Sequence, residues 1–314
     1  MKNRSIPRVQ VVVRFCLAVA TALMCVGVPT ASARECPQGT IAPTALSSIP
    51  PGCASAGLLV AVTADFTPAI PAPGDSAGAY SSSATGGWSA GILTTEGGQV
   101  GLRVQGAEYG SAEAVRRLRP QVVSPDPSVV LSGCGSSASY LLAGTAWAAG
   151  SAMFPWYYNA ASQPVGTPYT PLSLIQTGFA NAVADSSSCG MGATGATDNY
   201  RGATSSNTAN HDGRSVVGWA TFSDPSTLGM AWWWSTGGFT NEVDIRFDSS
   251  PASPFHMSHY LPVPSGYHDF ISLATHEVLH GYGLLDLKSP PFADDGQVMW
   301  ESMGLGAGSD RRTK

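Results

Sequence analysis

Charged residues are scarce in this sequence, since Asp, Glu, Lys and Arg together make up 12% of its 314 residues. Disordered chains have the opposite composition, so this scarcity favours a compact fold. Basic residues are outnumbered by acidic ones, 16 against 21, which gives a formal net charge of −5. A chain without a basic excess is a poor partner for nucleic acid, and we expect none to bind.

The sequence also lacks a convincing transmembrane segment near its N-terminus. The apolar run over residues 15–28 is shorter than the roughly 20 residues that a membrane-spanning helix needs. It follows four basic residues and precedes Ala31-Ser32-Ala33, the small-residue pattern that signal peptidase cuts. We therefore expect a signal peptide over residues 1–33 and a secreted, extracellular chain with no membrane attachment. Cleavage removes four basic and no acidic residues, so the formal charge changes from −5 to −9.

Cysteine is rare, and two of the six cysteines fall within the expected signal peptide. The other four, Cys36, Cys53, Cys134 and Cys189, are an even number in an oxidising compartment, which predicts two disulfide bonds. Three connectivities exist, and we favour the pairs nearest in sequence, Cys36 with Cys53 and Cys134 with Cys189. The alternative for Cys134 is a free thiolate that blocks a metal site and keeps the protein inactive.

Residues 34–145 have the pattern of short strands separated by turns. The sequence predicts a strand at residues 58–62, a hairpin over 88–104 around Glu96-Gly97-Gly98, and a short helix within 111–119. No group of residues here has catalytic spacing. The sequence leaves three interpretations open: a pro-segment, a β-rich accessory domain, or the first layer of the catalytic domain.

Residues 146–314 alternate between strand and helix patterns. Strands are predicted at residues 154–159, 215–222, 228–235 and 242–247, and helices from about residue 171 and over 269–283. This order predicts an α+β domain in which a helix face is buried against a sheet. Residues 193–213 contain acidic and amide oxygens that suit calcium, but their spacing fits no EF-hand, and we expect an ordinary loop.

The second predicted helix carries the sequence His276-Glu277-Val278-Leu279-His280. Side chains four residues apart on a helix point in the same direction, so His276 and His280 can both direct ring nitrogens at one Zn²⁺ ion. Glu277 is placed to reach a water molecule beside that ion, where it would act as a general base and proton shuttle. A bare HExxH pattern occurs by chance in many helices, and the residues that follow decide its meaning.

Gly283 and Asp286 continue the pattern. Gly283 lies three residues after His280, where the helix must end and the chain turn with φ positive, and Asp286 follows three residues later. Such a turn brings Asp286 back as a third ligand. Two histidines and one carboxylate leave a position open, as a catalytic zinc site requires. Asp294 or Asp295 is the alternative third ligand.

The segment HEVLHGYGLLD resembles the extended zinc motif of the metzincin metalloproteases, with Asp286 in the place of the usual third histidine, as in snapalysin-type proteases. FPWYYN and NEVDIRFDSS resemble segments of bacterial matrixin-like domains, so the resemblance covers roughly residues 150–303. It implies a metzincin-like catalytic domain, a twisted mixed sheet with two main helices, preceded by a β-rich N-terminal region. It also implies a methionine turn beneath the zinc, for which Met299 is the first candidate and Met303 the second.

The resemblance and the motif together predict a monomeric zinc metalloendopeptidase that cleaves an extended polypeptide. The substrate would pair with an exposed sheet edge near residues 230–234 or 242–248. His256, His259 and His268 offer a second metal site, but we expect them to be surface or substrate-rim histidines. The competing hypothesis is a secreted binding or surface protein that zinc stabilises without turnover. Glu277 argues against it, because a structural zinc site has no use for a carboxylate aimed at water.

Overall fold

The computed structural model describes residues 36–50, 53, 57–123, 140–148, 153–184, 197–206, 209–252, 254–287 and 298–306. They all belong to one compact unit, Cys36–Lys314. The expected signal peptide, Cys134, Cys189, Asp294 and Asp295 lie outside the described residues. Within the described part of the chain, no helix is long and apolar enough to cross a membrane.

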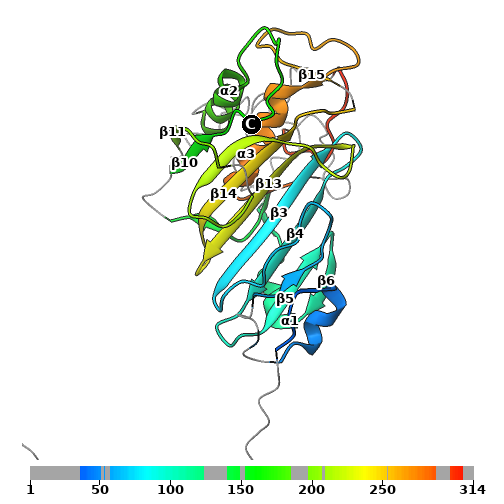
Figure 1. Ribbon diagram of the computed structural model, residues 1–314, viewed down its shortest axis with the longest axis vertical. Coiled ribbons are helices and arrows are strands. Elements are labelled where there is room, and N and C mark those ends of the chain that lie inside the picture. Colours follow the sequence, from blue (N-terminus) through cyan, green and yellow to red (C-terminus); the bar gives the residue numbers. More distant parts are fainter. Residues whose placement is uncertain are drawn as a thin grey trace, which may run out of the picture. The chain divides into compact units, whose positions relative to one another are not determined.

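The fold is α+β and is built on a ten-stranded mixed sheet. The strands follow the order β11-β10-β12-β14-β13-β3-β4-β5-β6, and the short β9 pairs with β14. Figure 1 shows β14, β13, β3 and β4 side by side. Strands β11, β10, β12 and β14 pair in parallel, whereas β13 is antiparallel to both β14 and β3. The bounds are Asp75–Ser83 (β3), Trp88–Thr94 (β4), Val100–Val104 (β5), Ala107–Gly110 (β6), Ala146–Trp147 (β9), Met153–Tyr158 (β10), Thr197–Ala203 (β11), Ser215–Ala220 (β12), Thr227–Thr236 (β13) and Phe239–Asp248 (β14).

Seven short strands lie outside this sheet and form two two-stranded sheets and one three-stranded sheet. In the three-stranded sheet, which includes residues 284 and 285, β17 joins β8 and β8 joins β7, all antiparallel. The bounds are Thr40–Ile41 (β1), Leu59–Val60 (β2), Gln121–Val123 (β7), Tyr140–Leu142 (β8), Phe255–His256 (β15), His268–Asp269 (β16) and Leu284–Leu285 (β17).

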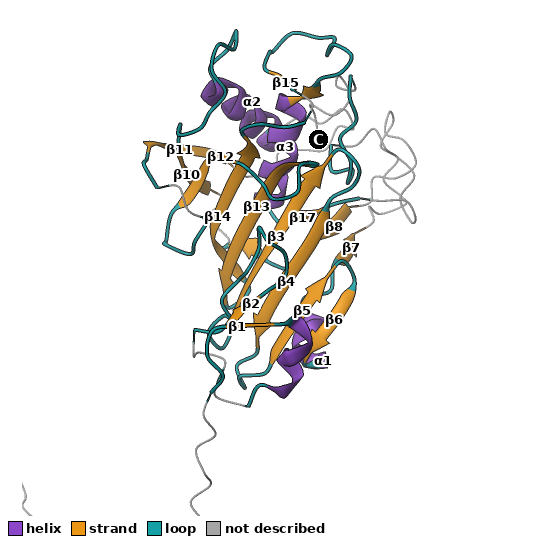
Figure 2. Cartoon of the chain, turned by 45° about the vertical axis from the view of Figure 1, so that its right-hand side comes forward, coloured by secondary structure: helices purple, strands orange, loops and turns teal. Residues whose placement is uncertain are grey.

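Two helices, α2 (Pro171–Val183) and α3 (Phe270–Gly281), pack against each other on one face of the sheet (Figure 2). Helix α2 begins where Pro171 fixes the first helical φ and the Thr170 side chain accepts the Ser173 N–H. Phe179 from α2 stacks on Trp156 from β10, with ring centroids 4.4 Å apart. The short helices η1 (Pro43–Ser48) and α1 (Ala112–Arg117) complete the described fold. Both predicted long helices are confirmed.

The two regions expected from the sequence share the large sheet. Strand β3, from the N-terminal region, pairs with β13, from the C-terminal region, with Ser83 opposite Thr227 and Asp75 opposite Thr236. The hairpin predicted over residues 88–104 is present as β4 and β5. Residues 75–110 therefore extend the sheet that carries β13 and β14. The disulfide expected between Cys36 and Cys53 is also confirmed.

The sequence interpretation of the strands differs from the structure at β11 and at β3. Residues 197–203, expected to be part of a loop, form β11 and pair in parallel with β10. Strand β3 was not predicted, because its sequence DSAGAYSSS lacks the alternation of apolar and polar residues that marks a strand. In both cases the neighbouring strand supplies the pairing that local sequence does not indicate.

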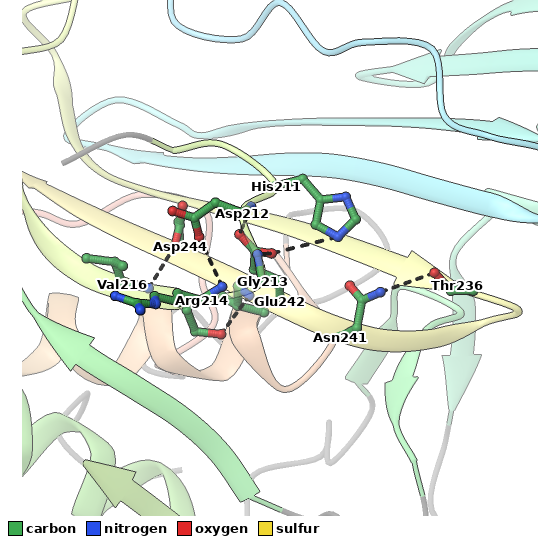
Figure 3. A network of polar contacts seen from close by, with 11 residues as sticks. His211, Asp212, Gly213, Arg214, Val216, Thr236, Asn241, Glu242 and Asp244 are labelled. Atoms are coloured by element: carbon green, nitrogen blue, oxygen red, sulfur yellow. Dashed lines mark hydrogen bonds and ion pairs between the residues drawn. The ribbon is translucent and has the colours of Figure 1, made fainter. Parts of the chain in front are cut away.

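Strand β14 buries charged side chains on the face opposite the helices (Figure 3). Glu242 accepts backbone N–H groups from loop residues 212 and 213, at 2.9 and 2.6 Å. Asp244 accepts the Val216 N–H at 2.7 Å, and Arg246 donates to the Val216 carbonyl at 2.9 Å. Burial raises the pKa of Asp244 to about 8, although the charge of Arg246 opposes this. This polar network ties the loop to the sheet.

Candidate metal centre

Helix α3 carries three of the predicted site residues, and all three are buried. His276, Glu277 and His280 have exposed fractions of 1%, 0% and 2%. The i, i+4 spacing sets both imidazoles on one side of the helix, with ring centroids 4.6 Å apart. The helix thus presents two ring nitrogens at one point inside the protein.

A turn after α3 brings the third predicted ligand to the same point. Gly283 has φ +90° and donates its N–H to the His280 carbonyl at 2.9 Å. A Cβ at this position would lie 2.7 Å from the Thr145 carbonyl oxygen, so both the backbone angle and the space require glycine. Past the turn, Asp286 Oδ1 lies 3.1 Å from His276 Nε2 and 3.3 Å from His280 Nε2.

The hydrogen bonds of the two histidines show which nitrogen of each ring carries the proton and which one faces Asp286 with a lone pair. His276 Nδ1 lies 2.6 Å from the Val298 carbonyl oxygen, and His280 Nδ1 lies 2.7 Å from the Leu284 carbonyl oxygen. A carbonyl only accepts, so each Nδ1 must carry the proton, and each Nε2 of a neutral ring is a lone-pair donor. Two nitrogen lone pairs and one carboxylate oxygen therefore converge in a buried space, which requires a cation or an added proton.

The pKa shifts of the charged groups also indicate a site that favours a cation. Burial raises the pKa of Asp286, but the nearby His280 and His276 lower it by more, so the pKa falls well below its usual range. Burial lowers the pKa of His276, but Asp286 outweighs this effect and raises that pKa overall. The site favours a negative carboxylate beside a positive charge.

Glu277 lies next to this group without a hydrogen bond of ordinary geometry to either carboxylate oxygen among the described residues. Burial raises its pKa, and the two histidines and the Ser82 hydroxyl oppose this by less. Gly229 of β13 faces it so closely that a Cβ there would lie 2.6 Å from Glu277 Oε1. The Glu277 carboxylate is closely packed beside the three candidate ligands and is not itself one of that group.

The segment that contains the predicted methionine turn also supports the site. Met299 is 4% exposed and belongs to the same core cluster as Leu279, Leu285 and Met303. Its carbonyl accepts the Leu287 N–H at 2.7 Å, directly after Asp286 in the chain. The residue before it, Val298, holds His276. This segment therefore packs beside His276.

Two features of the site were not anticipated from the sequence. The first is the pair of carbonyls from Val298 and Leu284, because backbone acceptors leave no mark in a sequence. The second is Tyr80 of β3, whose ring stacks on His280 with centroids 4.6 Å apart and planes 20° apart. Tyr80 belongs to the N-terminal region, where no residue had catalytic spacing.

The other histidines of interest lie elsewhere. His256 Nε2 contacts the Tyr260 carbonyl at 2.9 Å, and His259 packs edge-on against Tyr169. His268 is 2% exposed in β16, so the expectation of a surface or substrate-rim position was wrong for this residue. Among the described residues, the only group of three His, Cys, Asp or Glu side chains whose ligand atoms converge, within 4.8 Å of one another, is His276, His280 and Asp286.

Comparison with known proteins identifies no relative of this chain. No protein family matches the sequence, and no curated protein or solved structure is significantly similar to it.

Proposed function

We propose that this protein is a secreted zinc-dependent endopeptidase with a metzincin-like catalytic domain over residues 146–314. The observation that carries the proposal is the convergence of two Nε2 lone pairs and the Asp286 carboxylate beside a buried Glu277. A mixed sheet with two main helices supports the metzincin-like architecture.

The donor set suits zinc. Two imidazoles and one carboxylate are ligands that Zn²⁺ takes in catalytic sites, where a fourth position stays open. The Val298 and Leu284 carbonyls serve as outer partners that fix the tautomer and orientation of each ring. When bound, zinc supplies Lewis acidity, which polarises a carbonyl oxygen and lowers the pKa of water to about 7.

Glu277 then moves the proton. A carboxylate oxygen of Glu277 takes a proton from the water that attacks the scissile carbonyl and delivers it to the nitrogen of the leaving amine. Its burial supports this role, because burial raises the pKa of the carboxyl group toward the pH at which a general base works best. No covalent bond between protein and substrate is needed.

One observation favours the competing hypothesis of a zinc-stabilised protein without turnover. Every side chain on α3 that the chemistry needs has an exposed fraction of 2% or less, as in a structural site. The buried carboxylate of Glu277 opposes that interpretation, because burying a carboxylate with so little hydrogen bonding costs stability and brings a structural site no benefit.

Casein hydrolysis separates the two functions. The zinc-loaded protein is incubated with casein, then with casein and a chelator, and finally with zinc restored. The proposal expects cleavage that stops on chelation and returns with zinc, while far-UV circular dichroism shows a folded chain throughout. A folded protein with one zinc ion per chain and no cleavage, even when the metal site has been made accessible to substrate, supports the binding protein instead.

A further inference from the structure

The edge of β13 that was expected to receive a peptide is already occupied. Residues 230–234 were predicted to pair with an extended substrate, but β3 pairs with β13 along its whole length. The second expected edge, residues 242–248, is flanked by β12 and β13. The prediction of an exposed edge was therefore wrong for both segments in this structure.

Strand β3 and the loop that follows it also close over the metal centre. Tyr80 stacks on His280, and a Cβ built on Gly87 would lie 3.3 Å from Asp286 Oδ2. The Gly87 N–H donates to the Glu301 carbonyl at 2.8 Å, and Ser83 accepts the Met303 N–H at 3.1 Å. These contacts join the hairpin to the segment after the methionine turn.

A substrate cannot reach the site in this arrangement. General-base catalysis requires the attacking water within about 3 Å of Glu277. With Glu277 fully buried and both histidines nearly so, a peptide can enter only after some element moves.

The composition of β3 indicates how this strand is held against β13. Eight of its nine residues are Asp, Ser, Ala or Gly, and Tyr80 is its only large side chain. Little apolar area holds such a strand, so the backbone ladder with β13 supplies much of its attachment. An extended peptide on β13 would form the same kind of ladder.

We propose that hairpin β3–β4 occupies the edge of β13 at which a peptide substrate would pair. The protein is therefore latent until the hairpin leaves β13. This inference rests on the proposed peptidase function and adds its regulation. It assigns to residues 75–94 an inhibitory role in place of a purely structural one.

A reversible lock tests the proposal. Ser76 and Ser235 lie opposite each other on β3 and β13, with hydroxyl oxygens 2.5 Å apart. Two cysteines there would need only a small adjustment to reach the S–S distance of about 2.05 Å. The double variant Ser76→Cys/Ser235→Cys can thus be locked by oxidation and released by mild reduction. Wild type and Ser76→Cys, treated identically, control for reduction of Cys36–Cys53.

Two readouts are taken on the full-length, zinc-loaded protein: casein hydrolysis and the rate at which a chelator strips the zinc. Oxidation should lower both at least 10-fold relative to the reduced double variant, with no such change in the controls. Equal rates in both redox states overturn the proposal. Ser81→Pro, which weakens the ladder from within β3, should accelerate zinc stripping, and a rate equal to wild type also counts against it.

The two proposals fail differently. If zinc never binds, the peptidase function falls and the latency proposal falls with it. If zinc binds but casein stays intact in every form, the stripping rates still decide whether the hairpin controls access to the site.

Discussion

The substitution Gly229→Ala tests whether the position of the Glu277 carboxylate matters for catalysis. The added Cβ would lie 2.6 Å from Glu277 Oε1 and 3.0 Å from its Cδ, whereas ordinary contacts begin at 3.4 Å. The carboxylate must therefore shift by roughly 0.8 Å, and it has no exposed side toward which to move. A misplacement of about 1 Å can cost 10²-fold in rate. We expect turnover to fall about 100-fold while zinc content stays unchanged.

The assay compares kcat/KM for a fluorogenic peptide with zinc content from elemental analysis and with the thermal unfolding midpoint. Gly304→Ala is the matched control, because a Cβ there meets no atom within 4 Å. A folded, zinc-bound Gly229→Ala protein with wild-type kcat/KM would refute the reasoning. Loss of zinc in that variant would show that Gly229 supports the ligands rather than Glu277.

Three further predictions concern the third ligand, a buried acid and the disulfide. Asp286→Ala should lower zinc affinity about 10-fold or more, with activity partly rescued by excess zinc; full affinity in a zinc titration would assign the third ligand elsewhere. Asp244 has a folded-state pKa of about 8 against 3.8 unfolded, so its stabilising neutral form is complete below pH 4 and is lost as pH rises to 8. Asp244→Asn stays neutral, so between pH 4 and pH 8 the free energy of unfolding of wild type should fall relative to that of the variant by on the order of 5 kcal/mol in denaturant titrations. A difference between variant and wild type that does not change with pH contradicts the raised pKa. Replacing Cys36 and Cys53 by serine opens a link across 17 residues and should cost about 3 kcal/mol in the same assay, with zinc binding retained.

The sequence predicted the elements that have a strong local pattern. Helices α2 and α3 have apolar residues at helical spacing, strands β12, β13 and β14 are rich in β-branched and aromatic residues, and all five are present. The i, i+4 histidines and the glycine turn also indicated in advance where His276, His280 and Asp286 would meet. These are local relations, which a sequence contains directly.

The remaining features depend on contacts between distant segments. Strand β3 has small side chains, and only its pairing with β13 makes it a strand. The stacking of Tyr80 on His280 follows from that same pairing and joins residues 200 positions apart. Glu242 and Asp244 alternate with apolar neighbours, which usually indicates a solvated face, but loop residues 212 and 213 cover it. No local pattern predicts such contacts.

The substitution Glu277→Gln tests the central claim most directly, because it keeps the side-chain shape and all three ligands but removes the base. Turnover of casein and zinc content are measured on the same preparations of wild type and variant. We expect one zinc ion per chain in both and a loss of turnover of about 10²–10⁴-fold in the variant. A zinc-loaded Glu277→Gln protein that cleaves casein at the wild-type rate would contradict the proposed mechanism.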